Sequence, residues 1–151
     1  MEAPRVRPGV AAPELRQALN SLDDLTAQFS TKSGIAIGFS HLLRLRASQL
    51  NQCAFCVRLH ARDAVRHGES PDRVALVAAW RDTEYYTAKE RAALAIVEAV
   101  TCIADAHVPN DVYMEAAAAL SPEAIAAVVW IAAVTGTWNR ISIPGRPTVR
   151  P

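Results

Sequence analysis

Apolar residues recur at intervals of three and four positions along most of the chain, and no stretch alternates between apolar and polar residues. The first spacing places apolar side chains on one face of an α-helix, whereas strict alternation is typical of a half-buried β-strand. The pattern therefore predicts an all-α protein with about seven helices. The first begins at Pro13, with leucines at 15, 19, 22 and 25, and the others span about 35–50, 53–67, 71–80, 87–106, 110–120 and 122–140.

Local signals mark several of these helix boundaries. Thr87 with Glu90 three residues later forms a capping-box pattern, which satisfies free backbone amides at a helix start. Ser121-Pro122-Glu123 combines an N-cap residue, a first-turn proline and a first-turn acid. Gly68 is the type of residue that commonly follows a helix end, so it predicts the end of the helix over 53–67. Asn51-Gln52 predicts a turn between two helices.

Six of the nine prolines lie near the two ends of the chain. Proline fixes φ and lacks an amide donor, so both ends are expected to be extended. We therefore predict an extended N-terminal tail over residues 1–12 and an extended C-terminal tail over residues 144–151. Between them no repeat or flexible linker interrupts the pattern, which indicates a single helical domain over residues 13–143.

Two predicted helices are apolar on all sides. Residues 92–104 contain one charged residue, Glu98, and residues 124–134 contain none. A helix of this kind must be buried all round, either at the centre of the fold or against another subunit. We therefore expect a homo-oligomer that sediments as a dimer or a larger species.

Composition narrows the possible functions. The chain has 151 residues, of which 51% are hydrophobic and 21% charged, and its formal net charge is +1. These values are typical of a globular domain and give no basis for nucleic-acid binding or for attraction to an anionic membrane. The longest uncharged apolar stretch, residues 124–139, is shorter than the ~20 residues of a membrane span. With no secretory signal visible, a cytoplasmic location is expected.

The residues that suggest chemistry are Cys53, Cys56 and His60. On a helix that starts at Cys53, the two cysteines share a face, with Cα atoms about 5–6 Å apart, the distance that a disulfide prefers. His60 lies one turn beyond Cys56, where its imidazole can reach the Cys56 sulfur and favour the reactive thiolate. Cys56 is therefore the better nucleophile by position. Cys53 can resolve a sulfenic acid on Cys56 by forming a disulfide.

Other interpretations of the same residues remain open. The two cysteines could be small buried hydrophobic residues. A zinc site could combine Cys53, Cys56 and His60 with an outside ligand such as His41, but seven helical residues separate Cys53 from His60 by about 10.5 Å along the axis. A thioredoxin-type motif would require a βαβ unit, which the pattern lacks. No metal and no bound organic cofactor are expected.

The stretch around these cysteines resembles the carboxymuconolactone decarboxylase / AhpD-like alkylhydroperoxidase superfamily. The resemblance extends over about residues 29–143. It is carried by Arg46, Ser48, Gln49, Asn51, Cys53, Ala54, Cys56 and His60, by Trp80-Arg81, by residues 87–94, and by Trp138-Asn139-Arg140.

This resemblance implies an AhpD-like helical fold that assembles as trimers or hexamers and acts as a thiol peroxidase. It implies that Cys56 becomes the sulfenic acid, that Cys53 is proton donor and resolving thiol, and that His60 is the relay base. The expected partners are a small-molecule peroxide and a thiol reductant protein. Alternatives are an activity like that of carboxymuconolactone decarboxylase, or a non-catalytic protein that senses oxidation or mediates interactions.

The chain departs from the family pattern at three positions. His41 stands where the family usually has a glutamate of the proton relay, Gln52 replaces a small residue, and Phe55 replaces a histidine found in one branch. On a helix antiparallel to the one carrying Cys53, His41 would face the cysteine pair. We therefore include His41 among the catalytic candidates and expect thiol reactivity to fall in a His41→Ala variant.

Two further residues are expected to be structural. Cys102 lies in an apolar run, so a buried free thiol is the simplest interpretation. Arg140 directly follows the last apolar helix and is expected to form an ion pair or a cap.

Overall fold

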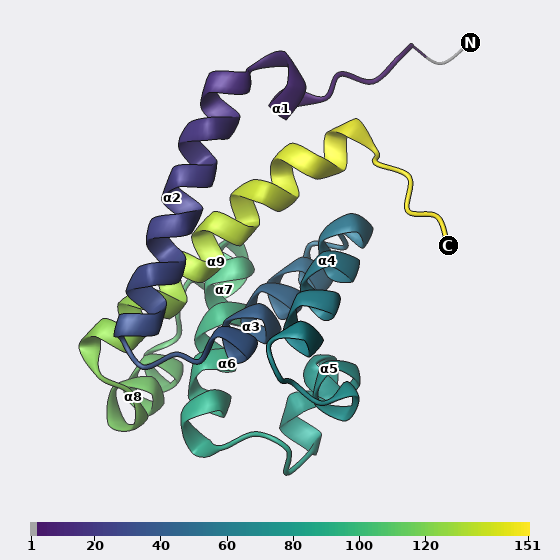
Figure 1. Cartoon of the computed structure of the whole chain (residues 1–151). Coiled ribbons are helices and arrows are strands. Elements are labelled where there is room, and N and C mark those ends of the chain that lie inside the picture. The colour runs from purple at the N-terminus through teal and green to yellow at the C-terminus, as the bar shows by residue number, and fades with distance from the viewer. Residues whose placement is uncertain (1–2) are drawn as a thin grey trace.

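Helices make up all the regular secondary structure in the computed structural model, which describes residues 3–151 (Figure 1). This confirms the prediction of an all-α fold. The α-helices are α1 Pro8–Ala11, α2 Pro13–Lys32, α3 Ile37–Leu50, α4 Ala54–Arg66, α5 Pro71–Leu76, α6 Ala88–Thr101, α7 Ile103–Ala106, α8 Asn110–Ala119 and α9 Pro122–Ser142, and two 3₁₀ segments are η1 Val77–Asp82 and η2 Ile143–Gly145.

The core lies where α3, α6 and α9 meet. Its largest fully buried side chains come from these three helices and from η1, and include Leu42, Leu45, Leu94, Val97, Val77, Val128 and Ile131. Figure 1 shows the long α2 lying beside α9 on one side of this core, while α4 packs against α3 on another. The α9 helix is long and apolar enough to cross a membrane by composition, but 56% of its most apolar stretch is buried inside the fold, as expected of a core helix.

The α3 and α4 helices form an antiparallel hairpin whose two ends are both tightly constrained. At one end the chain reverses through Asn51 and Gln52, and Gln52 has a positive φ of 56°. At the other end, a Cβ added to Gly38 would lie 2.7 Å from the carbonyl oxygen of His67, so only glycine allows this close approach. The hairpin therefore brings the first turns of α3 against the last turns of α4.

The capping signals in the sequence are confirmed. The Thr87 hydroxyl accepts a hydrogen bond from the Glu90 amide while the Glu90 carboxylate accepts one from the Thr87 amide. Ser121 caps α9 by accepting from the Ala124 amide. Gly68 follows the end of α4 with a φ of 95°, which glycine adopts without strain.

Three expectations about helix boundaries are wrong. The helix expected over 71–80 is α-helical only to Leu76 and continues as the 3₁₀ segment η1, with non-helical φ and ψ at Ala79. The continuous helix expected over 87–106 is broken at Cys102, whose φ of −97° and ψ of 38° separate α6 from α7. The N-terminal segment expected to be extended contains the one-turn helix α1, because Pro8 occupies a first-turn position where its missing amide is not needed. The first two residues of the expected C-terminal tail, Pro144 and Gly145, belong to η2, and residues 146–151 have no regular secondary structure.

The apolar helices are covered mostly by their own chain. Residues 92–94, 96 and 97 of α6 are buried, and α9 leaves Val129 and Trp130 as its large exposed apolar side chains. The leucine face of α2 behaves differently, since the side chains of Leu15 and Leu25 are 73% and 61% exposed. Uncovered apolar surface therefore lies on α2 and on one face of α9, and further exposed apolar side chains lie on α4 and α8.

A cluster of charges ties α3, α6 and η1 together. The carboxylate of Glu98 accepts hydrogen bonds from Arg46 at 2.7 Å, from the Trp80 indole at 2.9 Å and from Arg81 at 2.5 Å. Burial alone would raise the pKa of Glu98, but these hydrogen bonds outweigh it and hold the pKa below its ordinary value of 4.5. Folding therefore favours the ionised carboxylate.

Replacing Glu98 with glutamine should lower the free energy of unfolding at pH 7 by roughly 2 kcal/mol, because Arg46 loses its charged partner. A depressed folded-state pKa gives stability above the unfolded pKa that is lost as pH falls through the folded pKa. The difference between wild type and Glu98→Gln should therefore shrink below about pH 4.5. Urea unfolding at several pH values checks this, with the exposed Glu115→Gln as the matched control, which should change stability by less than about 0.5 kcal/mol. A difference that is independent of pH would contradict this assignment.

Candidate active site

Cys53 and Cys56 stand at the start of α4 and are joined in a disulfide, with their Cα atoms 5.3 Å apart. Cys53 is the N-cap residue and Cys56 lies in the first turn. Both are buried, at 2% and 4% exposure. A helix N-terminus carries partial positive charge from unpaired amides, so a thiolate formed at Cys56 in the reduced protein would be stabilised there.

A buried polar network holds the turn that leads into this pair. The Cys53 amide donates to the Ser48 carbonyl at 3.0 Å. The Asn139 side chain of α9 donates to the Ser48 hydroxyl at 3.1 Å and accepts from the Asn51 side chain at 3.0 Å. Asn139 is fully buried, so each of these bonds forms in a low-dielectric interior where an unsatisfied amide is expensive.

His60 lies one helical turn beyond Cys56 and is 9% exposed. Burial, together with the positive charges of Arg44 and His41, lowers the pKa of His60 to about 3, so the ring is neutral at physiological pH. Its Nδ1 is buried with no hydrogen-bond partner among residues 3–151. A neutral imidazole with a free nitrogen can accept a proton, and a thiolate beside it would raise its pKa.

His41 projects from α3 into a stack of three imidazoles. Its ring centroid lies 5.9 Å from that of His60 and 5.0 Å from that of His67. Burial, opposed by the Asp63 carboxylate, lowers the pKa of His41. The hairpin thus brings His41 near His60 and adds His67, which the sequence had not linked to the site, whereas the contact of His41 with the cysteine pair stays a prediction.

A cavity of about 620 Å³ opens beside these rings. His41 and His60 line it, together with Leu59, Arg44 and Asp63, whereas the two cysteines do not. Further residues that line it come mainly from α2 and are Asp23, Asp24, Ala27, Gln28, Thr31 and Lys32, with Ile37 and Ser40 from α3. His60 therefore lies both on this cavity and one helical turn beyond Cys56.

Arg44 and Asp63 are site residues that sequence reasoning missed. Arg44 is buried and forms a 2.7 Å ion pair with Asp23 of α2, and Asp23 also accepts from the Trp138 indole at 2.9 Å. Their helical spacing offered a signal, because Arg44 lies three residues after His41 and Asp63 three after His60. Without the hairpin geometry, that spacing could not show that both face the same cavity.

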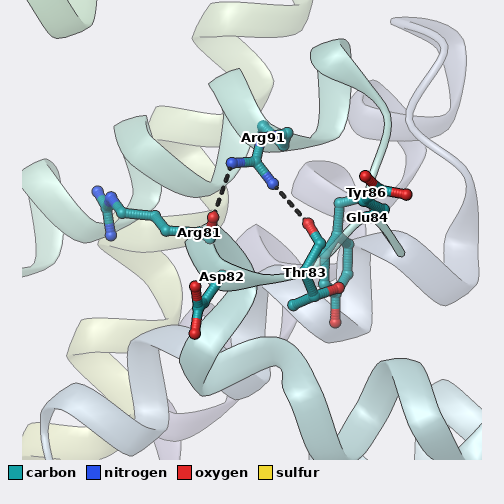
Figure 2. Close-up of a pocket in the computed structure, with 6 residues that line it drawn as sticks. All are labelled: Arg81, Asp82, Thr83, Glu84, Tyr86 and Arg91. Carbon is teal, nitrogen blue, oxygen red and sulfur yellow. Dashed lines mark hydrogen bonds between the residues drawn. The ribbon is translucent and has the colours of Figure 1, made fainter.

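A second cavity, of about 570 Å³, lies between η1 and the start of α6 (Figure 2). The guanidinium of Arg91 donates to the backbone carbonyls of Trp80, Arg81 and Thr83 at 2.9 to 3.0 Å. Figure 2 shows two of these bonds, those to Arg81 and Thr83. Arg81 is in turn bound to Glu98. Both arginines therefore have structural partners, and the His60 cavity is the better candidate site.

Cys102 and Arg140 do not have the surroundings expected of them. Cys102 is a free cysteine and is partly exposed at the break between α6 and α7, rather than buried. Arg140 donates to the Gly136 carbonyl one turn earlier in its own helix, at 3.0 Å, and is exposed. No ion pair of Arg140 forms with any residue of the described part of the chain.

Comparison with known proteins supports the resemblance seen in the sequence. The model of the carboxymuconolactone decarboxylase family matches residues 13–99. YdfG of Bacillus subtilis (strain 168), an uncharacterized protein, is 33% identical over 132 residues, which cover 87% of each chain.

Two solved structures share the fold. The Agrobacterium tumefaciens protein ATU0492, described as of unknown function and as a candidate antioxidant defence protein AhpD, is 35% identical, with a TM-score of 0.86 over 97% of each chain. The debrominase Bmp8 has a TM-score of 0.82 at 24% identity over 93% of this chain and 73% of its own, which shows a common fold alone.

Substitutions at Gln52 test the strain in the turn before Cys53. A residue with a side chain lowers the stability of the fold by about 1–2 kcal/mol when its φ is positive. Glycine avoids this strain but lowers the stability by roughly 0.5–1 kcal/mol, because it loses more conformational entropy on folding. Gln52→Gly should therefore raise the free energy of unfolding by about 0.5 kcal/mol, whereas the β-branched Gln52→Val should lower it by about 1 kcal/mol or more. Urea unfolding with the disulfide intact measures both. Equal stability of the valine variant and wild type would contradict the left-handed turn.

Proposed function

The chain belongs to the carboxymuconolactone decarboxylase family and has an AhpD-like fold, and from this starting point we propose that it is a thiol-dependent peroxidase. The observation that carries the proposal is the Cys53–Cys56 pair at the N-terminus of α4, at disulfide distance and with His60 one turn along. The substrate is a small organic peroxide or hydrogen peroxide.

The reaction begins with the reduced pair. His60 takes the proton of the Cys56 thiol, and the thiolate attacks one oxygen of the peroxide. The O–O bond breaks, Cys56 becomes a sulfenic acid, and the leaving alkoxide or hydroxide takes a proton to become alcohol or water. The Cys53 thiol then attacks the Cys56 sulfur, releasing water and closing the disulfide.

The position of each sulfur supports this division of roles. Cys56 lies inside the first turn of α4 and four residues before His60, so both the helix N-terminus and the imidazole favour its thiolate. Cys53 is the N-cap residue, fixed through its amide to the Ser48 carbonyl, and it lies within bonding distance of Cys56. This position supports the proposal that Cys53 is the resolving thiol.

In this mechanism His41 influences the transfer of the Cys56 thiol proton indirectly, through its effect on His60. Its ring stacks near the His60 ring, on the opposite helix of the hairpin. It occupies the position at which related sequences usually carry glutamate, so a neutral imidazole replaces a carboxylate as the second group of the relay. We assign His41 a positioning role, and retain the expectation that thiol reactivity falls in His41→Ala.

Turnover needs an external dithiol, because two electrons must return to the disulfide for each peroxide reduced. We propose a thiol reductant protein for this role and a cytoplasmic location, where thiols are kept reduced. The thiol chemistry itself needs no bound organic cofactor.

We also propose a homo-oligomer, a trimer or hexamer, assembled through the uncovered apolar faces. Leu15 and Leu25 of α2 and Trp130 of α9 are large apolar side chains with about half or more of their surface exposed. Burying such surfaces gains about 25 cal/mol per Å². Sedimentation at micromolar concentration should therefore show a species larger than a monomer, and Leu25→Glu should shift it toward the monomer. A wild-type monomer would contradict the assembly.

Peroxide consumption with excess dithiothreitol tests the activity. Wild type should turn over repeatedly, and Cys56→Ser should lose turnover by at least about 100-fold, since it removes the nucleophile. Cys53→Ser should still consume about one equivalent of peroxide but slow in later cycles. Cys102→Ser is the matched control, because it removes a cysteine outside the pair, and it should retain wild-type turnover.

The other outcomes distinguish the alternatives. Full turnover in Cys56→Ser would contradict the proposal. Consumption of one equivalent of peroxide by wild type without further cycles would indicate a redox sensor. Turnover of a small carboxylic acid in the absence of thiols would indicate chemistry like that of carboxymuconolactone decarboxylase.

A further inference from the structure

Three side chains with metal-ligating atoms converge at one end of the α3–α4 hairpin. His41, His60 and Asp63 each offer one such atom, and these atoms all lie within 4.8 Å of one another. His60 and Asp63 are three residues apart on α4, so they share a helix face, and α3 brings His41 opposite them. All three line the 620 Å³ cavity.

Two of these side chains lack the partners that burial normally demands. The Nδ1 atoms of His41 and His60 are both buried without a hydrogen-bond partner among residues 3–151. An unsatisfied buried polar atom costs about 1–3 kcal/mol, and native structures contain few of them. Two such atoms on neighbouring rings that line one cavity point to a ligand that binds imidazole nitrogens.

We propose that His41, His60 and Asp63 bind one Zn²⁺ ion in this cavity. Two imidazoles and one carboxylate form a donor set suited to zinc, with a fourth position left for water. Bonds of about 2.0–2.1 Å place tetrahedral ligand atoms ~3.4 Å apart, so ligand atoms that now lie up to 4.8 Å apart approach one another by up to about 1.4 Å on binding. The cavity leaves room for that movement and for the bound water.

The charges around the three ligands are compatible with a cation. Arg44 is the positive group closest in chain position to His41, and its 2.7 Å ion pair with Asp23 offsets its charge. Arg66 contacts Asp63 through Oδ1, at 3.0 Å, and its own side chain is 69% exposed, which leaves Oδ2 for the metal. Asp24 and Lys32 also line the cavity and contribute one charge of each sign.

This site is separate from any zinc site built on the cysteines. Neither sulfur lines the cavity, and a disulfide offers no thiolate to a metal. The two functions share His41, which positions His60 in the relay, and His60, whose free nitrogen cannot hold zinc and accept the Cys56 proton at once. Zinc binding therefore does not depend on the proposed peroxidase activity, and it can be measured in the oxidised protein.

Calorimetric titration with Zn²⁺ tests the site. The protein is untagged, freed of metal with a chelator, kept with the Cys53–Cys56 disulfide intact, and carries Cys102→Ser so that no thiol contributes. We expect one Zn²⁺ per chain. Loss of a supporting residue around a metal costs ~10–100-fold in affinity, so removing a ligand in His41→Gln or Asp63→Asn should weaken binding by at least about 100-fold.

Two matched controls separate coordination from general charge effects. His107→Asn removes an exposed histidine outside the cavity, and Asp24→Asn removes a cavity carboxylate outside the group of three. Both should bind Zn²⁺ within about threefold of the parent protein. Circular dichroism of each variant establishes that it is folded.

The results that would overturn the site are distinct from those that bear on the peroxidase. Absence of Zn²⁺ binding, or binding that survives in both His41→Gln and Asp63→Asn, contradicts the metal site. Binding lost in Asp24→Asn or His107→Asn places the ion elsewhere and contradicts it as well. Peroxide turnover of the wild type is measured with a chelator present, so its result does not depend on whether the protein binds Zn²⁺. Either proposal can therefore fail without the other.

Discussion

The reversal of the chain at Asn51–Gln52 is the constraint on which the site depends. It sets α4 antiparallel to α3 and makes Cys53 the N-cap of α4. It therefore fixes which cysteine lies inside the helix and which stands at its edge. The same reversal brings His41 of α3 opposite His60 of α4, and Gly38 allows the far end of the hairpin to close against His67. A different turn would separate His41 from the helix that carries Cys56 and His60.

Several of the residues that carry the family resemblance support the fold around this turn rather than the chemistry. Ser48, Asn51 and Asn139 form the buried network that ties the turn to the core helix α9. Arg46 binds Glu98, which ties α3 to α6. Since these groups are polar and largely buried, each is stable only when all its partners are present. The network therefore specifies one geometry for the cysteine pair.

The sequence predicted the fold well because its signals are local. Helical periodicity and the caps at Thr87, Gly68 and Ser121 act within a few residues, and the family resemblance added the topology. The break at Cys102 was missed because it lies in an apolar run without glycine or proline. The exposure of Leu25 was missed because periodicity identifies an apolar face without showing what covers it.

The cysteine pair and His60 could be predicted from the sequence because residues three and four apart on one helix lie on the same face. The cavity was not, because it depends on contacts between distant segments. Asp23 lies on α2, Arg44 on α3 and Asp63 on α4, and only the packed structure places them together. The convergence of Asp63 with the two histidines is likewise a product of the hairpin closing.

The proposed peroxidase chemistry requires that Cys53 and Cys56 form a redox pair set apart from the third cysteine, Cys102. Mass-spectrometric mapping of the reduced protein after one equivalent of peroxide tests this most directly. We predict a Cys53–Cys56 disulfide within one chain, with Cys102 still free. Oxidation at Cys102, a disulfide between chains, or an unreacted pair would contradict the account.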